Sequence, residues 1–176
     1  MSYSSDRYSS PALLLASTRR SEIGQLEYRA KWHDDADAVN RLTDILAHAA
    51  RRLHATSKLN AICAIPSSKP GKQSLPCKLA AALAVNLGLE DITARLRWNR
   101  EKDTIKDKEA SEKWSLLEDV GLTVDGDLKG VKVLMVDDMY QSGATVHFVA
   151  SKIQEAGSAS LQCIAVSKSR GDKDNV

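Results

Sequence analysis

Hydrophobic residues follow two patterns along the chain: short unbroken apolar runs, and longer stretches in which they recur every three or four positions. The second pattern is typical of a helix with one buried face. It covers residues 34–54, residues 76–87 and a stretch that begins near residue 144. Gly88 and Gly157 follow the last two stretches, where glycine commonly ends a helix. The chain is therefore predicted to contain three long amphipathic helices.

Residues 61–65 form an unbroken apolar run, and residues 131–136 and 161–166 are apolar except for Lys132 and Gln162. Strands that are apolar on both faces are typical of the centre of a parallel sheet. Residues 92–98 predict a further extended segment, and residues 22–32 are interpreted as either an edge strand or a hairpin. Because strands and helices alternate, the sequence predicts an α/β fold with a mostly parallel sheet flanked by helices.

The chain has 176 residues, of which 43% are apolar and 27% charged, which suits one domain of ordinary size. We expect a flexible terminus over residues 1–20 and a single domain over 21–176. No apolar run approaches the roughly 20 residues of a membrane helix, so we expect a cytoplasmic protein without membrane contact. The net charge of +2 does not favour nucleic acid as a partner.

Polar segments follow the predicted strands over residues 67–74, 99–113 and 137–145. Ligands of parallel sheets bind beyond the carboxyl ends of the strands. In the last segment two acids precede a short turn that enters a helix, whose N-terminal amides favour a phosphate. Acids beside a phosphate repel it unless a neutral or cationic group lies between, and ribose hydroxyls or Mg2+ meet that need. A sugar phosphate therefore matches the order of residues.

Residues 133–145, VLMVDDMYQSGAT, resemble the motif with which type I phosphoribosyltransferases bind phosphoribosyl pyrophosphate (PRPP). The resemblance implies a mostly parallel sheet with a small hood subdomain, here residues 21–35. It assigns Asp137 and Asp138 as catalytic residues and as ligands of the Mg2+ cofactor. The other motif residues would bind the substrate: Met139, Tyr140, Gln141, Ser142, Gly143, Ala144 and Thr145.

Two further segments match the same family less sharply. Residues 61–70 resemble its pyrophosphate loop, which implies that Ser67, Ser68 and Lys69 bind the diphosphate. Residues 99–113 lie where the family has a flexible lid, with Arg97 and Arg100 as candidate cations. The segment over residues 24–35, the long helix after it and the tail over residues 167–175 resemble the competence-associated, ComF-like branch, although the cysteine-rich zinc module common in that branch is not visible in this sequence.

What the resemblance implies is an enzyme that transfers the phosphoribosyl group from PRPP to a nitrogenous base and releases pyrophosphate. The acceptor resembles a nucleobase but is not identified, although Gln141 stands where some purine-salvage relatives have an acid. The family also implies a homodimer. Two alternatives stay open: a non-enzymatic protein that senses PRPP, and a partner-binding protein on the same fold.

Overall fold

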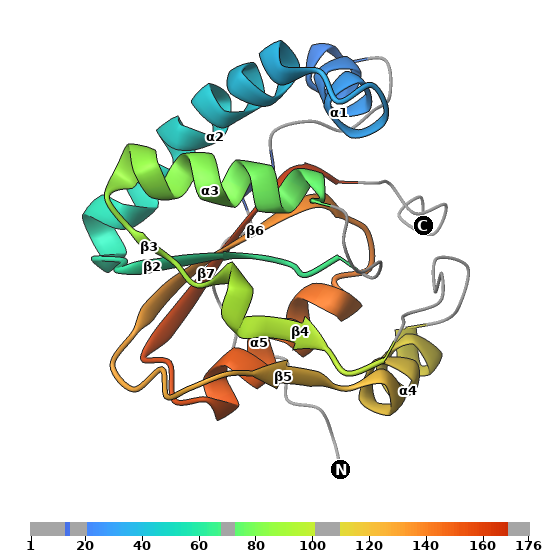
Figure 1. The fold of residues 1–176 in the computed structure, drawn as a ribbon, viewed down its shortest axis with the longest axis vertical. Helices are drawn as coiled ribbons and strands as arrows, with labels where there is room; N and C mark the ends of the chain where they lie inside the picture. Colours follow the sequence, from blue (N-terminus) through green and yellow to red (C-terminus); the bar gives the residue numbers. More distant parts are fainter. Residues whose placement is uncertain (1–12, 15–20, 68–72, 101–109, 169–176) are drawn as a thin grey trace, which may run out of the picture.

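The protein is described by a computed structural model over residues 13–14, 21–67, 73–100 and 110–168. Its centre is a sheet of five parallel strands in the order β1-β7-β6-β2-β3, and β4 and β5 form a separate antiparallel pair (Figure 1). The strands are β1 (Leu13–Leu14), β2 (Ala61–Ala64), β3 (Glu90–Asp91), β4 (Leu96–Trp98), β5 (Leu122–Val124), β6 (Lys132–Tyr140) and β7 (Ser160–Lys168).

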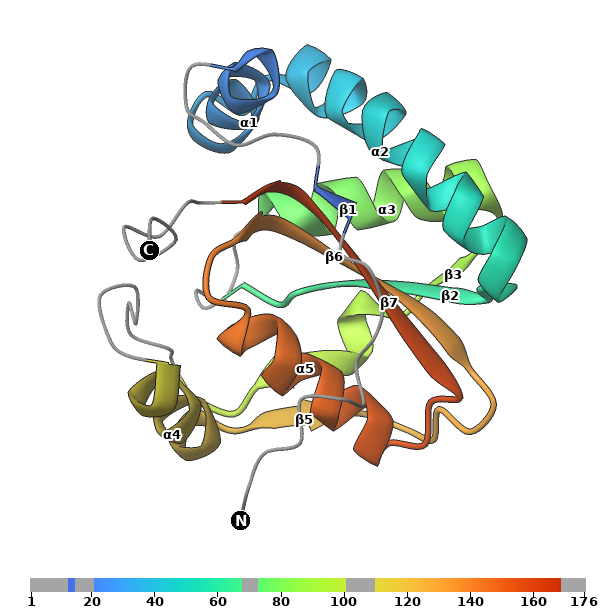
Figure 2. The same ribbon diagram turned by 180° about the vertical axis from the view of Figure 1, so that it is seen from behind.

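Helices cover both faces of the parallel sheet. On one face lie α1, α2 and α3, and on the other lie α4, α5 and the β4–β5 pair (Figures 1 and 2). The helices are α1 (Glu22–Trp32), α2 (Ala36–Ser57), α3 (Leu75–Leu87), α4 (Ala110–Val120) and α5 (Ala144–Glu155). The predicted α/β architecture, with a parallel sheet between helices, is therefore confirmed.

Strand β6 lies between β2 and β7 and divides the hydrophobic core into two parts. Successive side chains of a strand point to opposite faces of the sheet. Leu134 and Val136 accordingly pack on the side of α1, α2 and α3, whereas Val133 and Met135 pack on the side of α5. All four are fully buried, so a shift of β6 by one residue would exchange the two sets and is strongly disfavoured.

Residues 22–32 form a helix, so the expected edge strand or hairpin is wrong. The hydroxyl of Ser21 caps this helix by accepting a hydrogen bond from the N–H of Gly24 at 3.1 Å. Leu26 and Ala30 are 2% and 3% exposed and lie on one face of α1. Glu27 is buried on that same face, and a charged residue inside the apolar stripe hid the helical period from sequence analysis.

Residues 92–98 are only partly extended. The edge strand β3 ends at Asp91, whose carboxylate accepts a hydrogen bond from the N–H of Thr93 at 2.9 Å. The Thr93 hydroxyl in turn accepts from the N–H of Ala64 at 3.0 Å. These side-chain bonds hold a short 3-10 turn (Thr93–Arg95), after which the chain leaves the parallel sheet as β4.

Parts of the predicted terminus, lid and hood lie within the described residues. Leu13 and Leu14, inside the expected flexible terminus, pair with β7 in the parallel sheet. Residues 110–113 of the expected lid form the first turn of α4, while residues 101–109 lie outside the described residues. The hood predicted over residues 21–35 corresponds to α1 and the turn that follows it. The division into terminus and domain stays a prediction.

Replacing Phe148 by alanine tests the packing between α5 and the second sheet. Its ring is 1% exposed, stacks on Trp98 at a centroid distance of 6.0 Å and meets Trp114 edge-on at 5.4 Å. We expect Phe148→Ala to lower the free energy of unfolding by about 3–5 kcal/mol in urea titrations. Val85→Ala is the control, because that side chain is 86% exposed, and a change of similar size in both variants would contradict the assignment.

Candidate functional site

The carboxyl ends of β2 and β6 meet at one edge of the sheet. Ala64 pairs with Val136, and the N–H of Ile65 donates to the carbonyl of Val136 at 2.9 Å. Ser67, at the start of the loop predicted to bind pyrophosphate, therefore follows the strand next to the one that carries the two acids. Ser68 and Lys69 lie outside the described residues.

The two acids lie within β6, which runs to Tyr140, and not in a loop after it. The pairing with β7 keeps a constant register through this segment, so the side chains alternate and the two carboxylates leave the strand on opposite faces. Asp137 is 9% exposed and lies on the side of Cys163. Burial, followed by the charge of Asp137, raises the pKa of the Cys163 thiol to about 12. Its Oδ1 accepts a hydrogen bond from the N–H of Asp138 at 2.9 Å.

Asp138 faces α1, where it meets a lysine. The Nζ of Lys31 lies 2.5 Å from Oδ2 of Asp138, and the two side chains are 35% and 17% exposed. This ion pair joins residues 107 positions apart and was not anticipated from the sequence. Lys31 lies in the segment that the sequence predicts as a strand or hairpin, so the spacing of residues does not predict its contact with the motif.

Glu27 and Ser167 complete a polar cluster around this ion pair. The carboxyl of Glu27 is buried one helical turn before Lys31 and hydrogen-bonds with Ser167, whose hydroxyl also donates to the carbonyl of Asp138 at 3.4 Å. Burial raises the pKa of Glu27, the Asp138 charge adds to that effect, and Ser167 and Lys31 oppose it. The carboxyl groups of Asp138 and Glu27 therefore lie near a single ammonium group, that of Lys31.

Gly143 makes the turn from β6 into α5 possible. Its φ is +74°, and a Cβ there would clash with Oη of Tyr140 and lie 2.7 Å from Cζ of that ring. Gln141 and Ser142 are exposed at the turn, Thr145 is half-buried, and Ala144 is buried in the first turn of α5. Met139 is 41% exposed. The first N–H groups of α5 thus open at the sheet edge where a phosphate is expected.

Arg97, a candidate lid cation, forms its ion pair outside the motif. It lies in β4, and its guanidinium pairs at 3.2 Å with Asp125, the residue that follows β5. Arg100 is exposed at the end of the described segment. Trp98 packs on Phe148 and donates its indole N–H to the carbonyl of Pro66 at 2.9 Å, which fixes the start of the predicted pyrophosphate loop.

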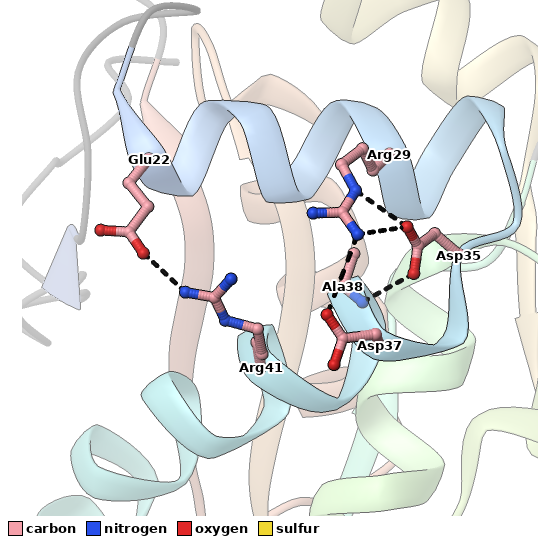
Figure 3. A network of polar contacts seen from close by, with 6 residues as sticks. All are labelled: Glu22, Arg29, Asp35, Asp37, Ala38 and Arg41. Carbon is pink, nitrogen blue, oxygen red and sulfur yellow. Dashed lines mark hydrogen bonds and ion pairs between the residues drawn. The ribbon is translucent and has the colours of Figure 1, made fainter.

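Ion pairs hold α1 against α2 beside the site (Figure 3). Arg29 pairs with Asp35 at 2.6 Å, and Arg41 pairs with Glu22 at 2.6 Å. Asp35 also caps α2 by accepting from the N–H of Ala38, and this bond, followed by Arg29, holds its pKa below the ordinary value. The turn between the two helices is tied to α3 by an ion pair between two further residues, Asp34 and Lys78.

Comparison with known proteins agrees with this architecture. No family model matches the sequence. The competence protein ComFC of Bacillus subtilis (strain 168) is 28% identical over 131 residues, which cover 74% of this chain. The chain spans about half (53%) of the length of that curated relative.

Solved enzymes, two of them phosphoribosyltransferases, share the fold at low sequence identity. An adenine phosphoribosyltransferase aligns with a TM-score of 0.55 and 14% identity over 77% of this chain and 72% of its own. The adenine phosphoribosyltransferase of Saccharomyces cerevisiae aligns with a TM-score of 0.53 and 14% identity, over 77% of this chain and 71% of its own. An allosteric regulatory enzyme of purine biosynthesis aligns with a TM-score of 0.51 and 20% identity, over 73% of this chain and 25% of its own.

The chain therefore has the fold of the type I phosphoribosyltransferases, as its motif predicted. Its similarity to ComFC confirms the resemblance to the competence-associated branch of that family. No described helix is both long enough and apolar enough to cross a bilayer.

The described side chains do not fit a single Mg2+ ion shared by Asp137 and Asp138. The two carboxylates leave opposite faces of β6, and one of them is paired with Lys31. Among the described residues, moreover, no three His, Cys, Asp or Glu side chains gather as a metal site. Mg2+ also binds through one carboxylate together with substrate oxygens, so its part in ligand binding stays a prediction.

Gly143→Ala tests the turn, and Gly88→Ala is its matched control. Both glycines have positive φ, +74° and +64°, so either substitution costs about 1–2 kcal/mol of backbone strain. A Cβ at Gly88 meets nothing within 4 Å, whereas at Gly143 it meets the Tyr140 ring and His147. We expect urea unfolding to show a larger loss of stability for Gly143→Ala, and equal losses would contradict the close approach.

Glu27→Gln tests the buried carboxyl. Because its pKa is raised above 4.5, the folded protein retains this proton to higher pH than the unfolded chain does. The free energy of unfolding should therefore fall as the pH rises from about 4.5 through the raised pKa. We expect Glu27→Gln to remove this fall in urea titrations between pH 4.5 and 8, while Glu22→Gln, on an exposed side chain, retains it. An unchanged pH dependence in Glu27→Gln would refute the interpretation.

Proposed function

We propose that the protein binds PRPP at the edge formed by β2, β6 and α5 and transfers its phosphoribosyl group to a nitrogenous base, with release of pyrophosphate. One observation carries the proposal: the motif forms a continuous strand, turn and helix on the phosphoribosyltransferase fold, next to the loop that follows β2. Because the chain spans about half of ComFC, the activity is inferred from this site and not from that relative.

Each part of the ligand has a matching part of the site. The 5-phosphate would accept hydrogen bonds from the N-terminal amides of α5 and from Thr145. The ribose hydroxyls would donate to the carboxylates of Asp138 and Asp137, and Asp138 is the more accessible of the two. The diphosphate would lie along the loop that begins at Ser67 and includes Ser68 and Lys69, under the lid that Arg97 and Arg100 adjoin.

The reaction displaces pyrophosphate from C1 of the ribose by a nitrogen of the base. The transition state resembles an oxocarbenium ion, so positive charge develops on the sugar, and catalysis consists of positioning and electrostatic stabilisation. The negative charges of Asp138 and, from the opposite face of β6, of Asp137 would stabilise that developing charge, while backbone amides and cations would stabilise the departing diphosphate. We assign no step to a metal ion held jointly by the two acids, because their side chains diverge.

The double variant Asp137→Asn/Asp138→Asn tests the proposal. Removing both negative charges next to the developing cation should lower pyrophosphate release from PRPP by at least about 100-fold, with the circular dichroism spectrum unchanged. Release is measured with a panel of nucleobases, because the acceptor is not identified. Asp44→Asn, on an exposed face of α2, is the control and should behave as wild type.

The outcomes separate the candidate functions. Wild-type turnover in the double variant would refute the role of the acids. If calorimetry shows that the wild-type protein binds PRPP but no base triggers pyrophosphate release, the non-enzymatic PRPP sensor is favoured. If PRPP at saturating concentration does not raise the melting temperature, the partner-binding alternative is favoured.

A further inference from the structure

An anionic ligand at this site faces an electrostatic problem. The ligand carries phosphate groups, and the strand that receives it presents two acids, one of which is only 9% exposed. Charges in a poorly solvated region interact more strongly than in bulk water. A cation is therefore needed near the acids when the phosphorylated sugar binds.

We propose that Lys31 of α1 is this cation: its ammonium group neutralises Asp138 and contacts the bound ligand, so that the phosphorylated ribose binds there without a metal ion on that carboxylate. The inference rests on the proposed function, because it concerns the binding of PRPP at the same site. It adds a residue from outside the motif and replaces the metal ligation that the sequence predicted for Asp138.

The geometry of the ion pair supports this role. Nζ of Lys31 lies 2.5 Å from Oδ2 of Asp138, as close as a direct charge-assisted hydrogen bond. An ammonium group has three donors, so one bond to Asp138 leaves donors for ligand oxygens. The Lys31 side chain is 35% exposed, which gives those donors access to a ligand at the sheet edge.

The helix that carries Lys31 is fixed in place. Leu26 and Ala30 anchor α1 in the core at 2% and 3% exposure. Arg29 binds the first turn of α2 through Asp35, and Arg41 of α2 binds the start of α1 through Glu22 (Figure 3). Binding of a ligand therefore requires only that the flexible lysine side chain adjusts, while the helix backbone stays in place.

The surroundings of the pair also require a cation. The buried Glu27 lies one helical turn from Lys31, and its carboxyl group senses the charges of both Asp138 and Lys31. Without the ammonium group, the negative charge of Asp138 would act unopposed on Glu27 and on the incoming phosphates. When Lys31 is removed, Mg2+ bound by Asp138 and ligand oxygens can take its place, because Mg2+ accepts a single carboxylate with substrate oxygens.

The test measures PRPP affinity by calorimetry on the full chain, once in EDTA and once in Mg2+. We expect wild type and Lys31→Arg to bind in EDTA, and Lys31→Met to bind about tenfold or more weakly there, as the loss of a charge-assisted contact implies. Mg2+ should bring Lys31→Met back to within about threefold of wild type. Arg95→Met removes an equal charge from an ion pair outside the site, that with Glu90 at 2.6 Å, and should match wild type in both conditions.

A double-mutant cycle keeps the test valid if Lys31→Met is unstable. In an Asp138→Asn background the acid has no charge to neutralise, so adding Lys31→Met should no longer change the ratio of affinities in Mg2+ and EDTA. The proposal is overturned if Lys31→Met binds PRPP as tightly as Arg95→Met in EDTA, if Mg2+ leaves the difference in affinity unchanged, or if wild type binds only with Mg2+. If wild type binds PRPP in neither condition, the proposed function itself fails.

Discussion

Side-chain alternation along β6 is the constraint on which the site depends. Four buried residues of this strand, Val133 to Val136, supply both halves of the core, and the ladders to β2 and β7 fix their register. The same alternation then continues into Asp137 and Asp138, which must therefore project to opposite sides. The chemistry available at the sheet edge is thus determined by the hydrophobic residues that precede it.

Helix α1 contributes side chains to the site from outside the motif. This helix lies beside the carboxyl end of the sheet, on the face to which Asp138 projects, and it brings one basic and one acidic side chain to that carboxylate. Its attachment to α2 through exposed ion pairs contributes little stability individually, since such pairs are worth about 0.2–1 kcal/mol. Burial of Leu26 and Ala30 is the larger contribution, and the ion pairs fix the orientation.

The periodic parts of the fold could be predicted from the sequence, and the irregular parts could not. The strands β2, β6 and β7 and the helices α2, α3 and α5 follow from apolar runs and helical spacing, and the resemblance of the motif predicts the fold. Helix α1 escaped prediction because Glu27 interrupts its apolar face. The contact between Lys31 and Asp138 joins distant segments, and no local pattern encodes it. The apolar pattern predicts that the strand ends before Asp137, because buried strands rarely contain acids. In the structure the backbone pairing of β6 with β7 continues through both acids.

The indole of Trp98 connects parts of the molecule that the sequence keeps apart. It stacks on Phe148, the ring against which Trp114 of α4 also rests, and its N–H holds the carbonyl of Pro66. These contacts connect α4 to the residues that directly follow β2. A displacement of α4 would therefore act on Phe148 and Trp98 and, through the indole N–H, on the carbonyl of Pro66.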